Sequence, residues 1–179
     1  MPLQRLHITG GPGSGKTTLS RHLSTRLRCE RFDLDGILID LREESPQPLE
    51  IVGKELAYIL AKERWVTEGV YMGWTKPLLE RADIILWADV PWRVASWRIL
   101  KRQLRANLDR NQRFPGMRGG LKFWRWARRY YNGGNAAELN QFGAPATRAY
   151  ALDLLQPYQS KLRILKSEAD HEAVLRELA

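Results

Sequence analysis

The chain has few of the residues that mark secreted, membrane-spanning or thiolate-metal proteins. Cys29 is the single cysteine among 179 residues, so an intrachain disulfide is impossible and a thiolate metal site has no support. No apolar run approaches the roughly 20 residues that cross a bilayer, and the N-terminus lacks the pattern of a signal peptide. The histidines at positions 7, 22 and 171 are isolated in the sequence. We therefore expect one globular domain over residues 1–179, cytoplasmic and without a membrane partner.

Acidic residues are scarce in one segment. Between Arg93 and Arg129 there are twelve lysines or arginines and one acid, Asp109, so this segment carries +11 in a chain of net charge +9. Such a patch attracts polyanions, which include nucleotide phosphates, nucleic acid and acidic surfaces. The alternative interpretation is a solvated basic face.

Strands and helices alternate along the sequence. Short apolar segments predict strands, and segments with apolar residues every three or four positions predict helices. The predicted strands are Leu3–Thr9, Glu30–Asp33, Trp65–Val70, Asp83–Val90 and Lys161–Leu165. The predicted helices are Lys16–Arg28, Pro48–Glu63, Lys76–Arg81, Pro91–Leu108, Leu121–Tyr131, Pro145–Gln156 and Glu168–Leu178. The order predicts an α/β fold whose parallel sheet is covered on both faces and binds ligands at the carboxyl ends of its strands.

Two predicted helices of the basic segment are amphipathic. Pro91–Leu108 has one apolar stripe, the pattern of a helix that faces a core. The stripe consists of Val94, Trp97, Leu100, Leu104 and Leu108. In Leu121–Tyr131 the aromatic and basic residues lie on opposite faces, so we expect Phe123 and Trp126 to pack in the core rather than to stack on bases. The stretch Asn107–Gly120 between the helices is predicted to be a loop.

A glycine-rich motif follows the first predicted strand and opens the first helix. It matches G-x-x-x-x-G-K-[ST], the Walker A pattern or P-loop, in the residues Gly10, Gly11, Pro12, Gly13, Ser14, Gly15, Lys16 and Thr17, with Thr18 next. Its glycines let backbone N–H groups curl around a phosphate, and the helix N-terminus adds positive charge. Lys16 would bridge the β- and γ-phosphates of ATP, and the Thr17 hydroxyl would bind Mg²⁺.

Acidic residues follow two other predicted strands. Asp33 and Asp35 are two positions apart, so in an extended chain both leave one face. We expect Asp33 to hold Mg²⁺ and Asp35 to orient or deprotonate the acceptor, which are the two roles that phosphoryl transfer requires. Alternatively, one of the two acids only caps the turn at Gly36. Glu68 is favoured over Asp89 as the third acid, because Asp89 precedes a proline and can cap the helix that follows.

The arginines of the basic segment suit a lid over ATP. The transferring phosphoryl group spreads negative charge over its oxygens, which cations stabilise. Arg98 and Arg102 lie on one face of their helix and are the favoured candidates; Arg113 and Arg118, in the following loop, are weaker ones. We place the lid at about residues 105–135.

The motifs together resemble one group of enzymes, the adenylate-kinase-related P-loop kinases. The nearest resemblance is to the small bacterial proteins labelled "DNA topology modulation protein", which are described as nucleoside or nucleotide kinases. The segments that carry it are Gly10–Thr18, Phe32–Gly36, Trp65–Tyr71, Ile84–Pro91 and Trp97–Arg102, and the tail Leu155–Ser167 extends it over most of the chain.

The resemblance implies a five-stranded parallel sheet in the order 2-3-1-4-5 and a set of site residues. Lys16 would stabilise the transferring phosphate, and Arg98 and Arg102 would contact ATP. Asp33 and Asp35 match acids that shikimate and gluconate kinases use around metal and acceptor.

One departure from the family concerns the acceptor. Glu68-Gly69 stands where adenylate kinases carry Asp-Gly, but no arginine follows in Tyr71–Trp74. The sequence therefore predicts an ATP- and Mg²⁺-dependent kinase of a small molecule, nucleoside- or nucleotide-like, with a nucleoside monophosphate disfavoured. The alternatives are a nucleic-acid-associated ATPase or DNA-binding protein and a nucleic-acid end kinase, either of which would use segment 93–129.

Overall fold

The computed structural model describes the chain except for residues 1–3, 38–47, 71–72, 109–115, 134–146 and 179. At its centre is a five-stranded sheet in the order β2-β3-β1-β4-β5 with every pair parallel. The strands are β1 (Arg5–Gly10), β2 (Glu30–Asp33), β3 (Trp65–Gly69), β4 (Ile84–Ala88) and β5 (Leu162–Leu165). The predicted fold class and strand order are confirmed.

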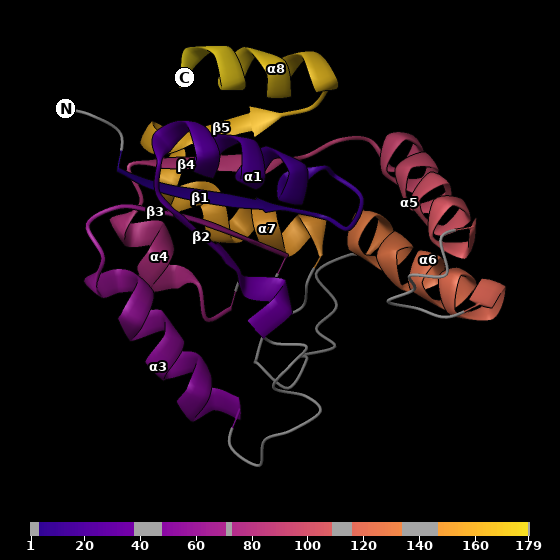
Figure 1. Cartoon of the computed structure of the whole chain (residues 1–179), viewed down its shortest axis with the longest axis horizontal. Helices are drawn as coiled ribbons and strands as arrows, with labels where there is room; N and C mark the ends of the chain where they lie inside the picture. Colours follow the sequence, from indigo (N-terminus) through magenta and orange to yellow (C-terminus); the bar gives the residue numbers. More distant parts are fainter. Residues whose placement is uncertain (1–3, 38–47, 71–72, 109–115, 134–146, 179) are drawn as a thin grey trace.

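Helices cover both faces of the sheet (Figure 1). One face carries α1 (Lys16–Leu27) and α8 (Glu168–Glu177), and the other carries α3 (Pro48–Ala61), α4 (Lys76–Arg81) and α7 (Arg148–Leu155). The 3₁₀ helix η1 (Gln156–Lys161) leads from α7 into β5. Two further helices, α5 (Trp92–Leu108) and α6 (Gly116–Asn132), project together beyond one end of the sheet.

The strands alternate their side chains between two apolar cores because successive residues point to opposite faces. On β4, Ile85 and Trp87 enter the core under α3, α4 and α7, whereas Leu86 enters the core under α1 and α8. Trp65 and Val66 divide in the same way on β3. β4 is therefore buried on both faces, as its continuous apolar run predicts.

Strand register brings the motifs to one edge of the sheet. Asp33 at the end of β2 lies opposite Glu68 on β3, and Thr9 on β1 lies opposite Gly69. Gly10 is at the carboxyl end of β1, where the phosphate-loop motif begins. Parallel pairing thus places the glycine-rich loop beside the carboxylates.

Some sequence predictions were wrong. Residues 116–120, predicted as loop, form the start of α6. The helix predicted over about Pro145–Gln156 is described over Arg148–Leu155, and residues 145–146 lie outside the described residues. Residues 34–37 form a helical turn, so Asp35 is not in an extended segment. The largest difference is the apolar stripe of α5: Trp97 and Leu104 are both 63% exposed and face solvent.

The described helices include none that is long and apolar enough to cross a membrane.

Candidate functional site

The glycine-rich loop turns tightly between β1 and α1. Gly13 has φ +78° and Gly15 φ +97°, left-handed conformations that favour glycine, and Gly15 lies immediately before α1. The Ser14 hydroxyl is buried and has no hydrogen-bond partner among the described residues. The loop therefore has a conformation that suits phosphate binding at a helix N-terminus, and the Ser14 hydroxyl is available to hydrogen-bond the phosphate.

Helices from the C-terminal half pack against this loop. A side chain at Gly11 would collide with the Tyr130 ring, and the Tyr131 hydroxyl donates to the Pro12 carbonyl over 3.0 Å. From α5, Arg98 Nη1 donates to the Ser14 carbonyl over 3.0 Å. The loop is thus held by α5 and α6 as well as by the sheet, and none of these contacts follows from the motif itself.

His171 of α8 also packs beside the loop. A Cβ at Gly15 would lie 3.3 Å from the His171 ring, which is buried and whose Nε2 has no partner among the described residues. Burial and the nearby Arg98 charge lower the pKa of His171, so the ring is neutral at pH 7. The sequence does not single out His171 because it lies more than 150 positions after the motif.

Lys16 is buried and points toward the carboxylates. Its Nζ lies 3.2 Å from Oδ2 of Asp35. Burial by itself would lower the pKa of Lys16, but the charges of Asp35 and Glu68 outweigh it and raise that pKa. Lys16 is therefore a cation at neutral pH, held between the loop and the acids.

Asp33 and Asp35 differ in how the backbone holds them. Asp33 Oδ1 accepts a hydrogen bond from the Gly36 N–H over 3.0 Å, so this acid does cap the turn, the alternative that the sequence left open. Asp35 Oδ1 accepts from the Val70 N–H over 2.7 Å, while its Oδ2 faces Lys16. Each aspartate therefore has one oxygen fixed by the backbone and a second directed elsewhere.

Gly69 allows the close approach of Asp35 to β3. A Cβ at Gly69 would lie 3.0 Å from Leu34 Cβ and 3.1 Å from Asp35 Oδ1. Any larger residue would push the 34–37 turn away from the strand. The Glu-Gly pair thus supplies an acid and the space beside it.

Glu68 is the most deeply buried of the three acids, with 0% exposure. Its Oε1 lies 3.2 Å from Arg31 Nη1, while its Oε2 has no geometric hydrogen-bond partner among the described residues. Burial raises the pKa of Glu68; the Lys16 charge and the nearby Thr17 hydroxyl oppose that rise, and Asp35 and Asp33 add to it. Arg31 was not predicted from the sequence, because only the β2–β3 register brings it to Glu68.

Together the three acids form a candidate cation site. One carboxylate oxygen from each of Asp33, Asp35 and Glu68 lies within 4.8 Å of the others. Mg²⁺ is commonly held by one or two carboxylates and several waters, and the unpartnered Oε2 of Glu68 is an oxygen that such a shell would satisfy. These residues therefore fit a hydrated divalent ion, with Thr17 at the adjoining helix start.

Asp89 lies elsewhere and has its own partner. Both of its oxygens accept hydrogen bonds from Arg148 at the start of α7, Oδ1 from Nε over 2.7 Å and Oδ2 from Nη2 over 2.6 Å. The Arg148 guanidinium also lies 5.4 Å from the Trp87 ring centroid. Asp89 thus joins β4 to α7 through a bidentate pair that sequence spacing does not reveal, and Glu68 is the acid in the cluster.

The candidate arginines lie in different environments. Arg98 reaches the loop and also pairs with Glu168 over 3.3 Å. The Arg102 guanidinium lies 5.5 Å from the Phe123 ring centroid. Arg113 lies outside the described residues, and Arg118 belongs to α6 but its side chain is not among those described. Of the lid predicted at residues 105–135, the structure describes mainly the helix α6.

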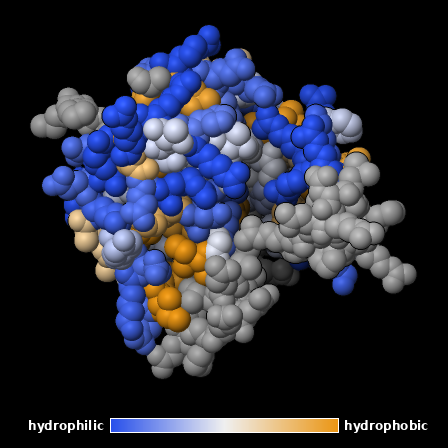
Figure 2. Space-filling view, viewed as in Figure 1, coloured by the Kyte–Doolittle hydropathy of each residue, from blue (hydrophilic) through white to orange (hydrophobic). Residues whose placement is uncertain are grey.

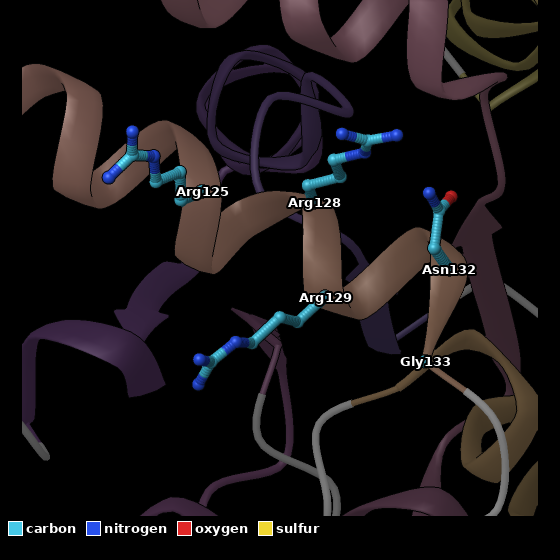
Figure 3. Close-up of a pocket in the computed structure, with 5 residues that line it drawn as sticks. All are labelled: Arg125, Arg128, Arg129, Asn132 and Gly133. Carbon is cyan, nitrogen blue, oxygen red and sulfur yellow. The ribbon is translucent and has the colours of Figure 1, made fainter.

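The exposed face of α6 is basic. A hollow of about 240 Å³ is lined by Arg125, Arg128, Arg129, Asn132 and Gly133. Figure 3 shows how these residues lie on and beside the helix. The guanidinium groups of Arg128 and Arg129 leave the helix on opposite sides rather than converging on one point. Trp126 stands on the same exposed side and is 42% exposed, so its predicted place in the core was wrong. Tyr130 of α6 is buried, so its ring is not available for stacking on a base.

Two sequence relatives match different shares of the chain. No protein-family model matches it. It is 27% identical to "Uncharacterized protein YqaC" of Bacillus subtilis over an alignment of 143 residues that covers 73% of this chain and 75% of the relative. It is 40% identical to "Putative adenylate kinase" of Pyrococcus furiosus over an alignment of 58 residues that covers 31% of this chain and 32% of that protein.

Solved structures of small-molecule kinases share the fold. Shikimate kinase from Bacteroides thetaiotaomicron matches with a TM-score of 0.55 at 15% identity, over 98% of this chain and 96% of that one. Deoxyadenosine kinase from M. mycoides, solved with bound dATP, matches with a TM-score of 0.52 at 15% identity, over 98% of each chain. At these identities the likeness shows that the chain has the fold found in P-loop kinases.

Proposed function

We propose that this protein is a kinase that transfers the γ-phosphoryl group of ATP, with Mg²⁺, to a hydroxyl group of a small-molecule acceptor. The observation that carries the proposal is the placement of Lys16 between a phosphate loop and three clustered carboxylates. The whole chain would act as one kinase domain with α6 in its lid. Its family would be that of the adenylate-kinase-related P-loop kinases, as the sequence motifs suggest.

The donor half of the proposed site is the loop Gly10–Thr17 with Thr18. Backbone N–H groups and the N-terminus of α1 would bind the phosphates, and Lys16 would leave Asp35 to contact the β- and γ-phosphates. This movement exchanges one anionic partner of Lys16 for another. Arg98, already at the Ser14 carbonyl, would turn toward the nucleotide, with Arg102 one helical turn further on.

The acceptor half is built around Asp35. Once Lys16 has moved, Asp35 Oδ2 would accept the proton of the acceptor hydroxyl, while Oδ1 stays fixed by Val70 N–H. The hydroxyl oxygen forms a bond to the γ-phosphorus as the bond to the β,γ-bridging oxygen breaks, releasing ADP. The contact between Asp35 Oδ1 and the Val70 N–H fixes the orientation of the carboxylate, so that Oδ2 faces the loop. Holding the reacting groups in the correct orientation in this way lowers the barrier to transfer.

Thr17 and Asp33 would hold Mg²⁺, with Glu68 in contact with its water shell. When bound, the ion would neutralise charge on the phosphates as it develops. Because Asp33 accepts the Gly36 N–H with Oδ1, its Oδ2 is the oxygen that would bind the ion. Glu68 would contact the water shell of the ion with Oε2. Arg31 would hold the Glu68 side chain in place across the strand pair.

The acid-lined acceptor side favours an uncharged hydroxyl compound. Three carboxylates face the loop there, against the two cations Lys16 and Arg31. Tyr71–Trp74 supplies no arginine for a second phosphate. A nucleoside or a sugar-like alcohol therefore fits better than a nucleoside monophosphate.

The test is phosphoryl transfer from labelled ATP to a panel of acceptors. The panel would include nucleosides, nucleoside monophosphates, shikimate, gluconate and short single-stranded oligonucleotides. We expect labelled product with a nucleoside or sugar-like alcohol, and none with Lys16→Ala. Lys54→Ala, which removes an exposed lysine of α3, should behave like the wild type.

Transfer that is equal in the wild type and Lys16→Ala would refute the site assignment. ATP hydrolysis stimulated by oligonucleotides, without any labelled acceptor, would instead support a nucleic-acid-associated ATPase. Label found on the oligonucleotide ends would support an end kinase.

A further inference from the structure

An apolar stripe on α5 faces solvent. Its described members are Val94, Trp97, Leu100 and Leu104, which are 39%, 63%, 43% and 63% exposed. The side of α5 that packs inward is formed by Ala95 and Ile99, both buried. The stripe is therefore surplus to the core, and clustered exposed apolar side chains of this size mark an interaction surface.

Cations flank this stripe. Lys101 and Arg105 are exposed on its edge. The neighbouring helix α6, which contacts α5 through the Trp124–Ser96 hydrogen bond, carries exposed Lys122 and Arg125. Neither α5 nor α6 contains an acidic residue. In Figure 2 orange surface interrupts the blue at the upper right, where α5 lies. The partner must therefore offer an apolar interior that the side chains of the stripe can enter, together with negative charge at its surface.

A second copy of the chain packed α5 against α5 does not meet these requirements. Two α5 stripes packed together would also bring acid-free, cation-rich helices against each other, and like charges at close range oppose association. Nucleic acid supplies the negative charge and could stack on Trp97. It offers no apolar interior, however, for the aliphatic side chains of Leu100 and Leu104.

An anionic bilayer meets both requirements. Helices that lie in a membrane surface combine Trp and Leu on one face with Lys and Arg beside it, and anionic head groups attract those cations. The helix α5 lies at one end of the molecule (Figure 1), and the side chains of its stripe are exposed, so the stripe can meet a flat surface. The spread guanidinium groups of α6 suit an array of head groups better than a single phosphate (Figure 3).

We propose that the α5 stripe, with the flanking cations of α5 and α6, is a docking surface for a membrane rich in anionic phospholipid. The expectation of no membrane partner rested on the lack of a spanning segment, which does not bear on attachment to a membrane surface. The proposal is independent of phosphoryl transfer and would stand if the protein had another activity.

The test is co-sedimentation of the full chain with lipid vesicles. One set contains phosphatidylcholine alone, and the other contains phosphatidylcholine mixed with phosphatidylglycerol. We expect binding to the mixed vesicles, weakened by salt, and little binding to phosphatidylcholine alone. The double variant Leu100→Ser, Leu104→Ser should lower binding by about tenfold or more, because it removes the part of the surface that enters the acyl region.

Matched controls separate the contribution of the apolar side chains from that of the cations. Leu152→Ser changes a 45% exposed leucine of α7, and it should leave vesicle binding unchanged. Lys101→Gln with Arg105→Gln should lower binding to anionic vesicles by about fivefold for each cation, whereas Arg21→Gln on the exposed side of α1 should have little effect.

Three outcomes would overturn the proposal. The first is equal binding to the two vesicle types, and the second is unchanged binding of the Leu100→Ser, Leu104→Ser variant that still folds by circular dichroism. The third is failure to bind vesicles combined with tight, salt-sensitive binding of a single-stranded oligonucleotide, which would assign the surface to nucleic acid.

Discussion

Two regions of the molecule, the carboxylate cluster at the β2–β3 edge of the sheet and the helices α5 and α6 that follow β4, have opposite chemistry. At the β2–β3 edge, three carboxylates lie within 4.8 Å of one another, and Glu68 is fully buried. In α5 and α6, cations are spread over helices without a single acid, and large apolar side chains face solvent. The acids are concentrated and fixed, whereas the cations are dispersed and mostly exposed.

This difference separates two kinds of site. Asp33 and Asp35 are held by backbone N–H groups and Glu68 is paired with Arg31, so the positions of the three carboxylates are set before any ligand arrives. Exposed lysines and arginines keep their conformational freedom and interact through long-range attraction. The first region suits chemistry on one small molecule, and the second suits contact with an extended surface.

The largest expected effect comes from breaking the fixed region at Asp35. Asp35→Asn removes the proposed proton acceptor and the partner of Lys16 while keeping the shape of the side chain. We expect kcat for transfer to the preferred acceptor to fall by about 10² to 10⁴-fold, the range typical of a lost general base. Steady-state kinetics with labelled ATP would measure it.

Asp153→Asn is the matched control, because Asp153 is an exposed aspartate of α7. It should leave kcat unchanged. If Asp35→Asn retained wild-type transfer to every acceptor, the acceptor half of the site would have to be assigned to other residues.

A smaller effect is expected from pH at Glu68. Burial and the neighbouring aspartates raise the pKa of Glu68, so protons compete with Mg²⁺ at a higher pH than at an ordinary glutamate. We expect Mg²⁺ affinity to fall as pH falls through this raised pKa, by up to about tenfold per pH unit below it. Calorimetric titration of Mg²⁺ at a series of pH values would measure the slope.

Glu68→Gln carries no titrating proton at this position. Its Mg²⁺ affinity should be weaker at neutral pH and should depend less on pH than that of the wild type. Identical slopes for the two proteins would show that Glu68 lies outside the metal's surroundings.

The sequence predicts the glycine-rich loop and its carboxylates better than it predicts the surface of α5 and α6. The loop Gly10–Thr17 is a contiguous motif whose conformation is imposed by its own glycines, and Asp33 and Glu68 follow strands whose parallel pairing brings them together. The Arg31–Glu68 and Asp89–Arg148 pairs depend on strand register and on helix packing, respectively, which residue spacing does not encode.

The orientation of α5 illustrates the same limit. Periodicity shows that its apolar residues share one side, but it does not say which side meets the core. Small residues decide the packing: buried Ala95 lets α5 approach the phosphate loop closely, where a Cβ at Gly13 would meet the Ala95 carbonyl at 2.7 Å. The larger Trp97 and Leu104 are consequently left facing solvent.

The smallest expected effect compares two tryptophans of α6. Trp124 packs its ring against Trp92 and donates from Nε1 to Ser96 over 2.8 Å, whereas Trp126 is 42% exposed and contacts Phe123. The same substitution, tryptophan to alanine, should therefore lower the free energy of unfolding by about 2 to 3 kcal/mol at Trp124 but by less than about 1 kcal/mol at Trp126. Urea denaturation of the two variants measures the difference. Equal losses would mean that the Trp126 ring belongs to the packed face of α6 after all.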